Sequence, residues 1–464
     1  MGRSCRINGM WSKKSVLTTL MISCLWLSAC GSQLIRNTVP APTLLPHTTR
    51  QMQMPGFWIN LLPAPDLPIL DKKGIEKLNR HIELTLKGSM DIMDEKSLQT
   101  GSALKSKLKK TLLKLKPFFN SSGEALSQKF MDKMAAQINI PAIKDKLSTR
   151  YGVVTSFSNQ RVLPTDDPVY SKPGNIDFDT LQNSALDLGT PVRILHETRD
   201  HKWFYVQSEL NEGWVRADFI AKCEKKEALV WYRPERFVVI TRAKADIFRN
   251  TELTNYHETV RMGVSLPCLD YKGETAEVYI PVANSHGDLI LKTGYLRTSA
   301  INKGFLPATS RNIVQQAFEM LNAPYGWGGM YGEQDCSRFI QEILATVGIR
   351  MPRNSLHQAR VGEKIGEFSR STDTLSRYKT LSLHARGGAT LLYLKGHIML
   401  YLGQVNDRHY AIHSTYAYGI PFKTMDQIIR VNRVAVSDLS LGLGSKKGSL
   451  AERLVSVRKL SPNF

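Results

Sequence analysis

The chain has 464 residues, of which 42% are hydrophobic and 22% are charged, and its formal net charge is +21. This length is too great for one ordinary hydrophobic core, so we expect several domains. The composition is that of a globular protein, and no segment after the N-terminus has the roughly 18 consecutive apolar residues that a membrane-spanning helix needs. Length and composition therefore exclude a single small domain and a body that crosses the membrane.

The first thirty residues form a separate unit. An apolar run from Val16 to Leu27 ends in the sequence Leu-Ser-Ala-Cys-Gly at residues 27–31, and four basic residues precede it. This pattern indicates an export signal. The end of the run resembles the lipobox of bacterial lipoproteins, which implies cleavage after residue 29 and acylation of Cys30. An ordinary signal peptide with an incidental cysteine is the alternative. The basic residues are Arg3, Arg6, Lys13 and Lys14.

The export signal has consequences for charge and location. Its removal takes away four positive charges, which leaves +17. Such basicity suits an exported protein that works on an anionic wall polymer or membrane surface, and export argues against nucleic acid as a partner. Because Gly31 follows Cys30, the resemblance implies an anchor in the outer membrane, facing the periplasm, if the host is Gram-negative. We expect residues 30–68, which are polar and contain prolines, to be a tether.

The mature chain is expected to keep an odd number of cysteines after the signal is removed and Cys30 is acylated. The three that remain are Cys223, Cys268 and Cys336. In an oxidising compartment at least one of them should be a free thiol. Cys223 and Cys268 either pair with each other or serve as two small buried hydrophobic residues.

Residues 69–155 are expected to form a helical domain. Up to about residue 143 the apolar residues recur at helical spacing, with lysines between them. One helix carries a lysine-rich face, which is either the solvated side of a packed helix or a surface for anionic lipid or wall polymer. The apolar positions of that helix are Leu104, Leu108, Leu112 and Leu115.

Short alternating runs with Gly and Pro between them predict small barrels of short strands. The first barrel is expected over residues 156–223, with strands near residues 189–194, 203–206 and 213–215. These runs resemble bacterial SH3-like domains, whose pattern is a Gly-Thr-Pro-Val strand, a turn before Trp and a closing Gly-Trp-Val strand. A second and looser copy is expected over residues 224–305.

The last segment, residues 306–464, starts with helices and ends with strands. Ser310 is suited to cap one helix, and a second is expected from Cys336 to Val347. Strand-like runs follow at residues 398–402 and 410–413. Helices that precede antiparallel strands indicate an α+β domain. We therefore predict a multidomain α+β protein.

Cys336 stands in the most informative stretch of the sequence. The turn Tyr-Gly-Trp-Gly-Gly at residues 325–329 precedes Asp-Cys-Ser at residues 335–337. We expect the cysteine in the first turn of an apolar helix, where unpaired amide groups and the helix dipole favour the thiolate. A thiolate nucleophile needs a base, and the base needs an orienting partner. His397 and His413 lie on consecutive predicted strands, which can bring the two imidazoles together.

Residues 306–464 resemble the NlpC-type family of papain-like cell-wall peptidases. Members carry a Tyr-x-Trp-Gly-Gly turn, an Asp-Cys-Ser motif, a Gly-His at the start of a strand and a third polar residue, usually His, on the next. This chain matches at residues 325–329, 335–337 and 396–397 and at His413. Residues 352–358 are similar to the family's Pro-Arg-x-Ser-x-x-Gln segment. The resemblance implies a papain-like catalytic domain after a helical domain and two SH3-like barrels, with no metal or cofactor.

The resemblance also implies a reaction. Its substrate is a murein stem peptide with a free N-terminal L-Ala, which relatives with a preceding SH3-like barrel cut between γ-D-Glu and the diamino acid. Cys336 is then the nucleophile and His397 its base. His413 is the residue that orients His397. A small buried hydrophobic residue and satisfied core histidines are the alternatives.

Four further residues receive substrate-binding roles from the resemblance. Asp335 and Ser337 would hold the ammonium group of the substrate, or else serve only local turn and cap bonding. Tyr325 would help the backbone amide of Cys336 to hold the oxyanion. Trp214 would close the cleft from the first barrel, or else belong to the core of that barrel.

Two positions depart from the family pattern. Arg338 follows Ser337 where Gly is usual, and Gly387-Gly388-Ala389 replaces Pro-Gly-Asp before the histidine strand. Arg338 is expected to alter the rim of the cleft. Two other functions stay open: a non-catalytic peptidoglycan-binding scaffold, and an amidase or acyltransferase on the same fold. The sequence does not decide between free peptides and intact peptidoglycan as the substrate.

Overall fold

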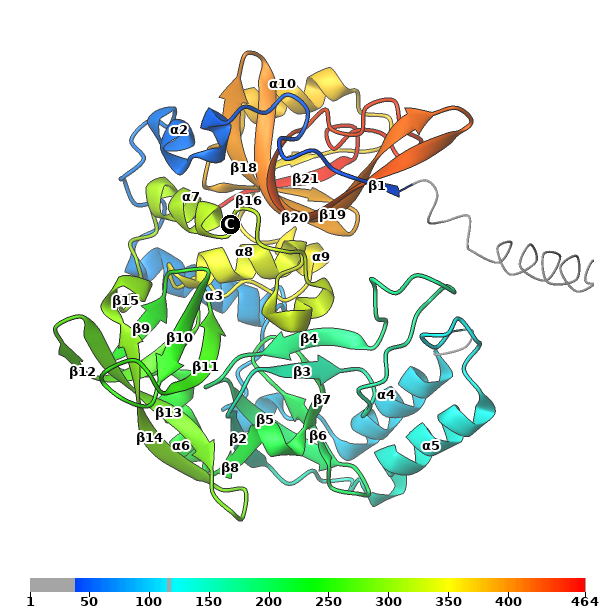
Figure 1. Ribbon diagram of the computed structural model, residues 1–464, viewed down its shortest axis with the longest axis vertical. Coiled ribbons are helices and arrows are strands. Elements are labelled where there is room, and N and C mark those ends of the chain that lie inside the picture. Colours follow the sequence, from blue (N-terminus) through cyan, green and yellow to red (C-terminus); the bar gives the residue numbers. More distant parts are fainter. Residues whose placement is uncertain (1–37, 115–117, 464) are drawn as a thin grey trace, which may run out of the picture.

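The computed structural model describes residues 38–114 and 118–463. Two small β-barrels and a C-terminal domain follow one another along the chain. In Figure 1 the C-terminal domain is at the top and the two barrels lie below it. The predicted signal peptide, residues 1–29, and the predicted lipidation site, Cys30, lie outside the described residues.

A seven-stranded sheet is the centre of the C-terminal domain. Its strand order is β1-β20-β19-β18-β17-β21-β16, and every pair is antiparallel except β1 with β20. The strands are β1 (Thr38–Pro40), β16 (Glu363–Glu367), β17 (Thr390–Leu394), β18 (His397–Val405), β19 (Arg408–Phe422), β20 (Met425–Asp438) and β21 (Leu454–Lys459). The helices of this domain are α7 (Ser310–Glu319), α8 (Cys336–Ala345), α9 (Ser355–Gln358) and α10 (Thr374–His384).

Both faces of this sheet are covered, because successive side chains of a strand point to opposite sides. In β17, Leu391 and Tyr393 join a core with α7 and α8, whereas Leu392 and Leu394 join a second core with Leu381 of α10. A strand buried on both faces reads as a continuous apolar run. That is why the sequence Thr-Leu-Leu-Tyr-Leu at residues 390–394 shows no alternation.

Residues 38–62 pack against the C-terminal domain. Strand β1 extends its sheet by pairing with β20, and helix α2 (Pro55–Asn60) contacts α7. The side chain of Trp58 is completely buried in the core of this domain, and its indole Nε1 donates to the carbonyl of Met52 at 2.8 Å. This differs from the predicted tether, because a tether has no buried anchor of this kind.

The first barrel shares its core with two helices. Leu104 and Leu108 of one helix and Met134 of the other pack with Trp203 and Trp214 of the barrel. The helices are α4 (Gly101–Leu113) and α5 (Gln128–Ile138), and the strands are β2 (Arg150–Val154), β3 (Ser158–Arg161), β4 (Gln182–Leu186), β5 (Pro191–Glu197), β6 (Trp203–Gln207), β7 (Glu212–Arg216) and β8 (Ile220–Cys223). The strand order is β4-β3-β7-β6-β5-β2-β8.

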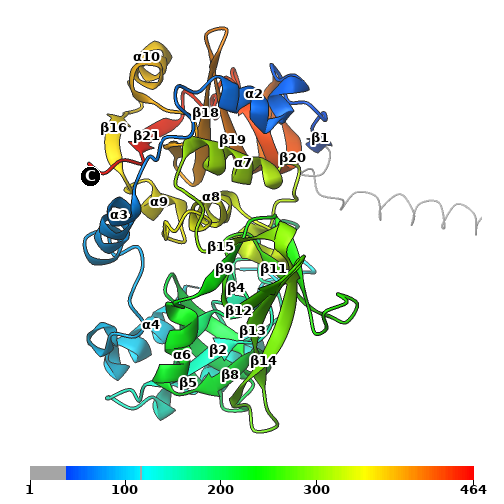
Figure 2. The same ribbon diagram turned by 90° about the vertical axis from the view of Figure 1, so that its left-hand side faces the viewer.

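Helix α3 (Lys72–Leu84) packs against the C-terminal domain and not against the first barrel. Leu78 and Ile82 are buried in the core of the C-terminal domain, and Asn79 donates to the carbonyl of Gly348 at 2.9 Å. Figure 2 shows α3 at the junction between that domain and the barrels. The helices predicted as one domain over residues 69–155 therefore divide between two cores.

The second barrel follows helix α6 (Lys225–Tyr232). Its strands are β9 (Phe237–Ile240), β10 (Lys244–Phe248), β11 (Tyr256–Arg261), β12 (Ser265–Lys272), β13 (Thr275–Ala283), β14 (Leu289–Arg297) and β15 (Ile301–Lys303). They follow the order β11-β10-β14-β13-β12-β9-β15. Cys223 and Cys268 are both free thiols in contact with this core, which decides between the two alternatives for the pair.

Some details of the helices differ from the prediction. Thr309, rather than Ser310, caps α7, because its hydroxyl accepts from the amide of Asn312. Helix α8 starts at Cys336 as predicted and ends at Ala345. Within residues 38–114 and 118–463, no helix is long and apolar enough to cross a membrane.

Candidate active site

Cys336 is the first residue of α8. The carboxylate of Asp335 caps this helix by accepting from the backbone amide of Arg338 at 2.8 Å. The preceding turn has positive φ at Gly328 and Gly329, 62° and 84°, a region that glycine enters without strain. A Cβ on Gly328 would lie 2.6 Å from the Gln182 side chain of the first barrel. Glycine is therefore required both by the turn and by the close approach of the barrel.

Two histidines and a serine form a chain of hydrogen bonds beside this cysteine. The backbone amide of Ile398, the residue after His397, lies close enough to the Cys336 sulfur to lower the pKa of the thiol. His397 Nε2 lies 2.6 Å from His413 Nδ1, and His413 Nε2 lies 2.8 Å from Ser437 Oγ. The predicted pairing of the two imidazoles on neighbouring strands is therefore present. Ser437, on β20, is a partner that the sequence analysis missed.

Burial sets the protonation of this group. It raises the pKa of the Cys336 thiol to about 12, with a further contribution from the carboxylate of Asp335. Burial also lowers the pKa of His397 to about 4, and the nearby Arg453 acts in the same direction. The pKa of His413 is lowered well below its usual value for the same reason. The direction of these shifts is opposite to that of the expected thiolate, because Cys336 and His397 are both shifted toward their neutral forms.

Comparison with known families and structures identifies this part of the chain. Residues 322–427 match the model of the NlpC/P60 family, and residues 168–216 match the model of the SH3 domain of the SH3b1 type. The chain carries an NlpC/P60 domain. This family supports a hydrolase of the cysteine-peptidase kind. Among curated proteins, none matches this chain.

Two solved structures are similar to large parts of the chain. An NlpC/P60 endopeptidase from Photobacterium damselae subsp. piscicida has a TM-score of 0.73 and 20% identity, over 92% of this chain and 100% of that one. An NlpC/P60 family protein from Bacillus cereus ATCC 10987 has a TM-score of 0.47 and 16% identity, over 67% of this chain and 99% of that one. The first of these likenesses and the two matched domains confirm the predicted multidomain α+β fold.

Asp335 and Ser337, on either side of the cysteine of the NlpC/P60 domain, are both engaged within the protein. Arg353 donates to the two oxygens of Asp335 at 2.8 and 3.2 Å and to the hydroxyl of Ser337 at 3.0 Å. Asp335 also accepts from Ser337 and from the amide of Gly328. Although burial opposes it, the Arg353 guanidinium holds the pKa of Asp335 below its usual value. This geometry matches the alternative of local turn and cap bonding.

An aromatic cluster joins the NlpC/P60 domain to the first barrel. Phe178, from the loop before β4, makes edge contacts with Tyr325, Trp327 and Tyr416 at centroid distances of 6.5, 5.2 and 4.8 Å. The indole of Trp327 donates to the carbonyl of Asp179 at 2.9 Å. Burial raises the pKa of Tyr325, with the Cys336 sulfur as the next cause, which favours a neutral phenol near Cys336.

Trp214 does not take part in this site. Its side chain is completely buried in the first barrel, where it contacts His196 and Tyr205. The prediction that it closes the cleft is wrong, because β7 directs it into the core. The barrel aromatic that does reach the NlpC/P60 domain is Phe178, which stands in an irregular loop with no strand pattern to reveal it.

Arg338 joins the NlpC/P60 domain to both barrels. It pairs with Asp187 of the first barrel at 2.6 Å and with Glu342 of α8 at 2.8 Å. Asp187 pairs in turn with Arg261 of the second barrel at 2.8 Å. Burial alone would raise the pKa of Asp187, but the two guanidinium groups lower it. Arg338, which departs from the family pattern, thus belongs to a network of ion pairs that connects three domains.

Proposed function

We propose that this protein hydrolyses murein stem peptides between γ-D-Glu and the diamino acid. The observation that carries the proposal is the chain of contacts from Cys336 through the His397 strand to His413 and Ser437, at the start of α8 in an NlpC/P60 domain. A thiol, a base and two orienting partners in this order are the parts that covalent acyl transfer requires.

The first half of the reaction follows from the neutral state of the pair. As the Cys336 sulfur attacks the peptide carbonyl, its proton passes to neutral His397 and a carbon–sulfur bond forms. The protonated imidazole then gives this proton to the departing amine as the carbon–nitrogen bond breaks. The product is a thioester on Cys336 and a free amino end. His413 keeps the ring of His397 in one orientation throughout.

Water completes the reaction with His397 as the base. The hydroxyl that forms attacks the thioester carbonyl, and the Cys336 sulfur leaves with the proton from the imidazole. In both halves the negative oxygen is held by the Cys336 amide at the start of α8 and by the hydroxyl of Tyr325. The raised pKa of Tyr325 supports this role, because a phenol must stay protonated to donate.

The preference for a free amino end is part of the proposal. Its support is the contact of the Phe178 loop and Gln182 with the Tyr-Gly-Trp-Gly-Gly turn, which places the first barrel beside the turn that precedes Cys336. Asp335 and Ser337 would receive the substrate ammonium only by exchanging it for Arg353. Such an exchange keeps the charge of Asp335 paired.

Replacement of the nucleophile tests this function. The variant Cys336→Ala should lower cleavage of the tripeptide L-Ala-γ-D-Glu-diaminopimelate by a factor on the order of 10⁴ or more. Mass spectrometry of the products identifies the bond. Cys268→Ala, which removes another buried free thiol, is the matched control and should keep full activity.

The same digest separates the competing functions. Unchanged turnover in Cys336→Ala would sink the mechanism. Wild-type protein that binds stem peptides and leaves every bond intact would support a scaffold, and release of the whole stem from muramic acid would support an amidase.

A further inference from the structure

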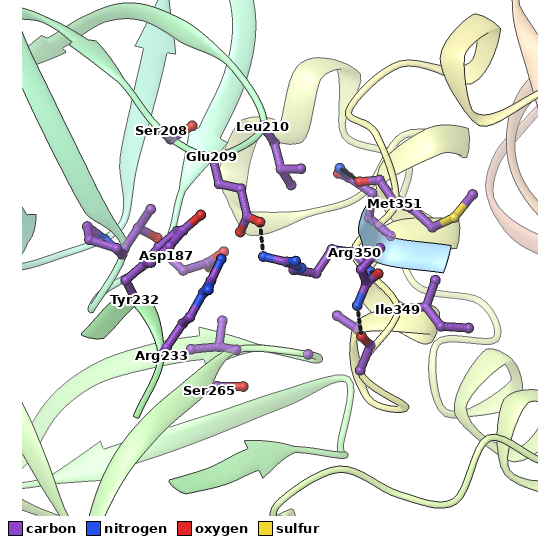
Figure 3. A pocket seen from close by; sticks show the side chains of 18 of the residues that line it. Asp187, Ser208, Glu209, Leu210, Tyr232, Arg233, Ser265, Ile349, Arg350 and Met351 are labelled. Carbon is purple, nitrogen blue, oxygen red and sulfur yellow. Dashed lines mark hydrogen bonds and ion pairs between the residues drawn. The ribbon is translucent and has the colours of Figure 1, made fainter. Parts of the chain in front are cut away.

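The charged groups of the cavity between the two barrels, α3 and α8 are paired with one another. Figure 3 shows Glu209 between Arg233 and Arg350, and its Oε1 lies 2.5 Å from Nη1 of Arg350. Arg233 lies 3.6 Å from a carboxylate oxygen of Asp91 on the same wall. These guanidinium groups already face carboxylates. Unpaired cations gather instead at the surface of the C-terminal domain, beside the turn between β19 and β20.

This turn, residues 422–425, is the tip of a long hairpin and exposes two large apolar side chains. Phe422 and Met425 lie directly opposite each other across the hairpin and are 47% and 57% exposed. Residues paired in this way direct their side chains to the same face. In Figure 1 the hairpin, in orange-red, projects from the side of the C-terminal domain. Neighbouring exposed apolar side chains, unlike single scattered ones, indicate an interaction surface.

A second loop lies against the hairpin near its tip. The backbone amide of Lys446 donates to the two carboxylate oxygens of Asp426 at 3.1 and 2.9 Å. Leu443, in the same loop, is 63% exposed. The loop therefore adds a third apolar side chain to the surface around the tip.

Three exposed lysines border these apolar side chains, and we call them the tip lysines. Lys423 lies in the turn, with its Nζ 5.5 Å from the centre of the Phe422 ring, and Lys446 and Lys447 lie in the second loop. Within residues 38–114 and 118–463, none of the three forms an ion pair. Apolar side chains bordered by lysines are complementary to a surface that offers hydrocarbon beneath anionic phosphates.

Strand β1 brings the start of the described chain to the same tip. It runs parallel to β20 and places Thr38 opposite Ile428, three residues from Met425, which is about 10 Å along the strand. Because the pairing is parallel, the N-terminal end of β1 faces the tip. Residues 30–37 separate the predicted acylation site from Thr38, and even a fully extended chain of that length spans at most ~29 Å. An acyl group on Cys30 would thus keep the tip within reach of a membrane.

We propose that the tip of the β19–β20 hairpin docks on an anionic phospholipid surface. Phe422 and Met425 enter the boundary between headgroups and acyl chains, and the tip lysines contact the phosphates. The acylation of Cys30 is part of this proposal. The two contacts together hold one edge of the C-terminal sheet against the membrane.

Co-sedimentation with vesicles tests the apolar part of this surface. The protein is the chain from residue 30 onward with Cys30→Ser, so that no acyl group contributes, and the vesicles hold equal amounts of phosphatidylcholine and phosphatidylglycerol. We expect Phe422→Ser/Met425→Ser to bind at least about tenfold more weakly than the parent. Leu113→Ser/Leu375→Ser, at side chains that are 79% and 77% exposed, is the matched control and should bind as the parent does.

The same assay tests the tip lysines. The variant is Lys423→Gln/Lys446→Gln/Lys447→Gln. Its binding should be weaker on the order of 100-fold, from about fivefold for each lysine. The lysine-rich face of α4 offers a matched control, because Figures 1 and 2 place it far from β20. The control removes three exposed lysines there and should keep the parent's affinity; it is Lys109→Gln/Lys110→Gln/Lys114→Gln.

Three results would overturn this docking surface. These are no binding to the vesicles, equal affinity of the parent and both tip variants, and equal affinity for vesicles of phosphatidylcholine alone. Sedimentation velocity without lipid tests a second copy of the chain as the occupant. A dimer that becomes a monomer in Phe422→Ser/Met425→Ser would assign the tip to self-association and would also overturn the proposal. Melting temperatures equal to that of the parent verify that the variants fold.

Discussion

At the residue scale, burial shifts Cys336 toward its neutral thiol form. Cys336 is 7% exposed, and the cost of placing a charge there outweighs the helix N-terminus and the Ile398 amide, both of which favour a thiolate. The pKa of His397 is lowered by the same cause. Both shifts favour the neutral form of each group, and in the proposed mechanism the proton moves when a substrate presents its carbonyl.

This state predicts how Cys336 reacts with a neutral alkylating reagent. Because its pKa is raised to about 12, the thiolate fraction should rise about tenfold per pH unit from pH 6 to 10. Iodoacetamide labelling of Cys336, followed by peptide mass spectrometry, measures this rate. A Cys223→Ala/Cys268→Ala background removes the other two described thiols. A labelling rate that is already level between pH 5 and 8 would show a thiolate–imidazolium pair and contradict the neutral state.

The sequence predicted Cys336 and the two histidines of the candidate site and missed the residues that surround them. Cys336 and His397 stand in short motifs whose spacing follows from a helix start and a strand start. Arg353 and Ser437 come from elsewhere in the domain, and a lone Arg or Ser has no pattern of its own. The pKa of Cys336 was expected in the wrong direction, because burial depends on contacts between distant segments, whereas the helix dipole can be read locally.

At the element scale, the segment before α3 acts as part of the C-terminal domain. Strand β1 lengthens its sheet and α2 covers α7. The sequence analysis took residues 30–68 for a tether on their polar and proline-containing composition. The signal against this was the apolar run Phe57-Trp58-Ile59, which is too short to show a helical period.

The packing of α2 leads to a stability prediction. Trp58→Ala should lower the free energy of unfolding of the C-terminal domain by about 3–5 kcal/mol, since it empties a completely buried site. Urea unfolding followed by circular dichroism measures the change. Met54→Ala, at a side chain that is 61% exposed, should stay within about 0.5 kcal/mol of the parent. Equal effects of the two variants would mean that this segment does not pack in solution.

At the scale of the whole molecule, charges buried between domains fix the barrels on the NlpC/P60 domain. Asp187, Arg261 and Arg338 come from three domains, and Asp187 and Arg261 are only 5% and 2% exposed. Removing one member of such a group leaves an uncompensated buried charge, so the arrangement resists rearrangement. In this arrangement the Phe178 loop lies beside the Tyr-Gly-Trp-Gly-Gly turn. Sequence periodicity predicts each barrel and carries no information on these contacts.

In the proposed function, the amino end of the substrate is the decisive variable, because the first barrel lies beside the turn that precedes Cys336. The most direct measurement compares cleavage of free L-Ala-γ-D-Glu-diaminopimelate with cleavage of the same stem attached to muramic acid, using mass spectrometry of the products. We predict that the free tripeptide is cut between γ-D-Glu and diaminopimelate and that the attached stem is not cut. Equal cleavage of both, or cleavage at another bond, would contradict this account.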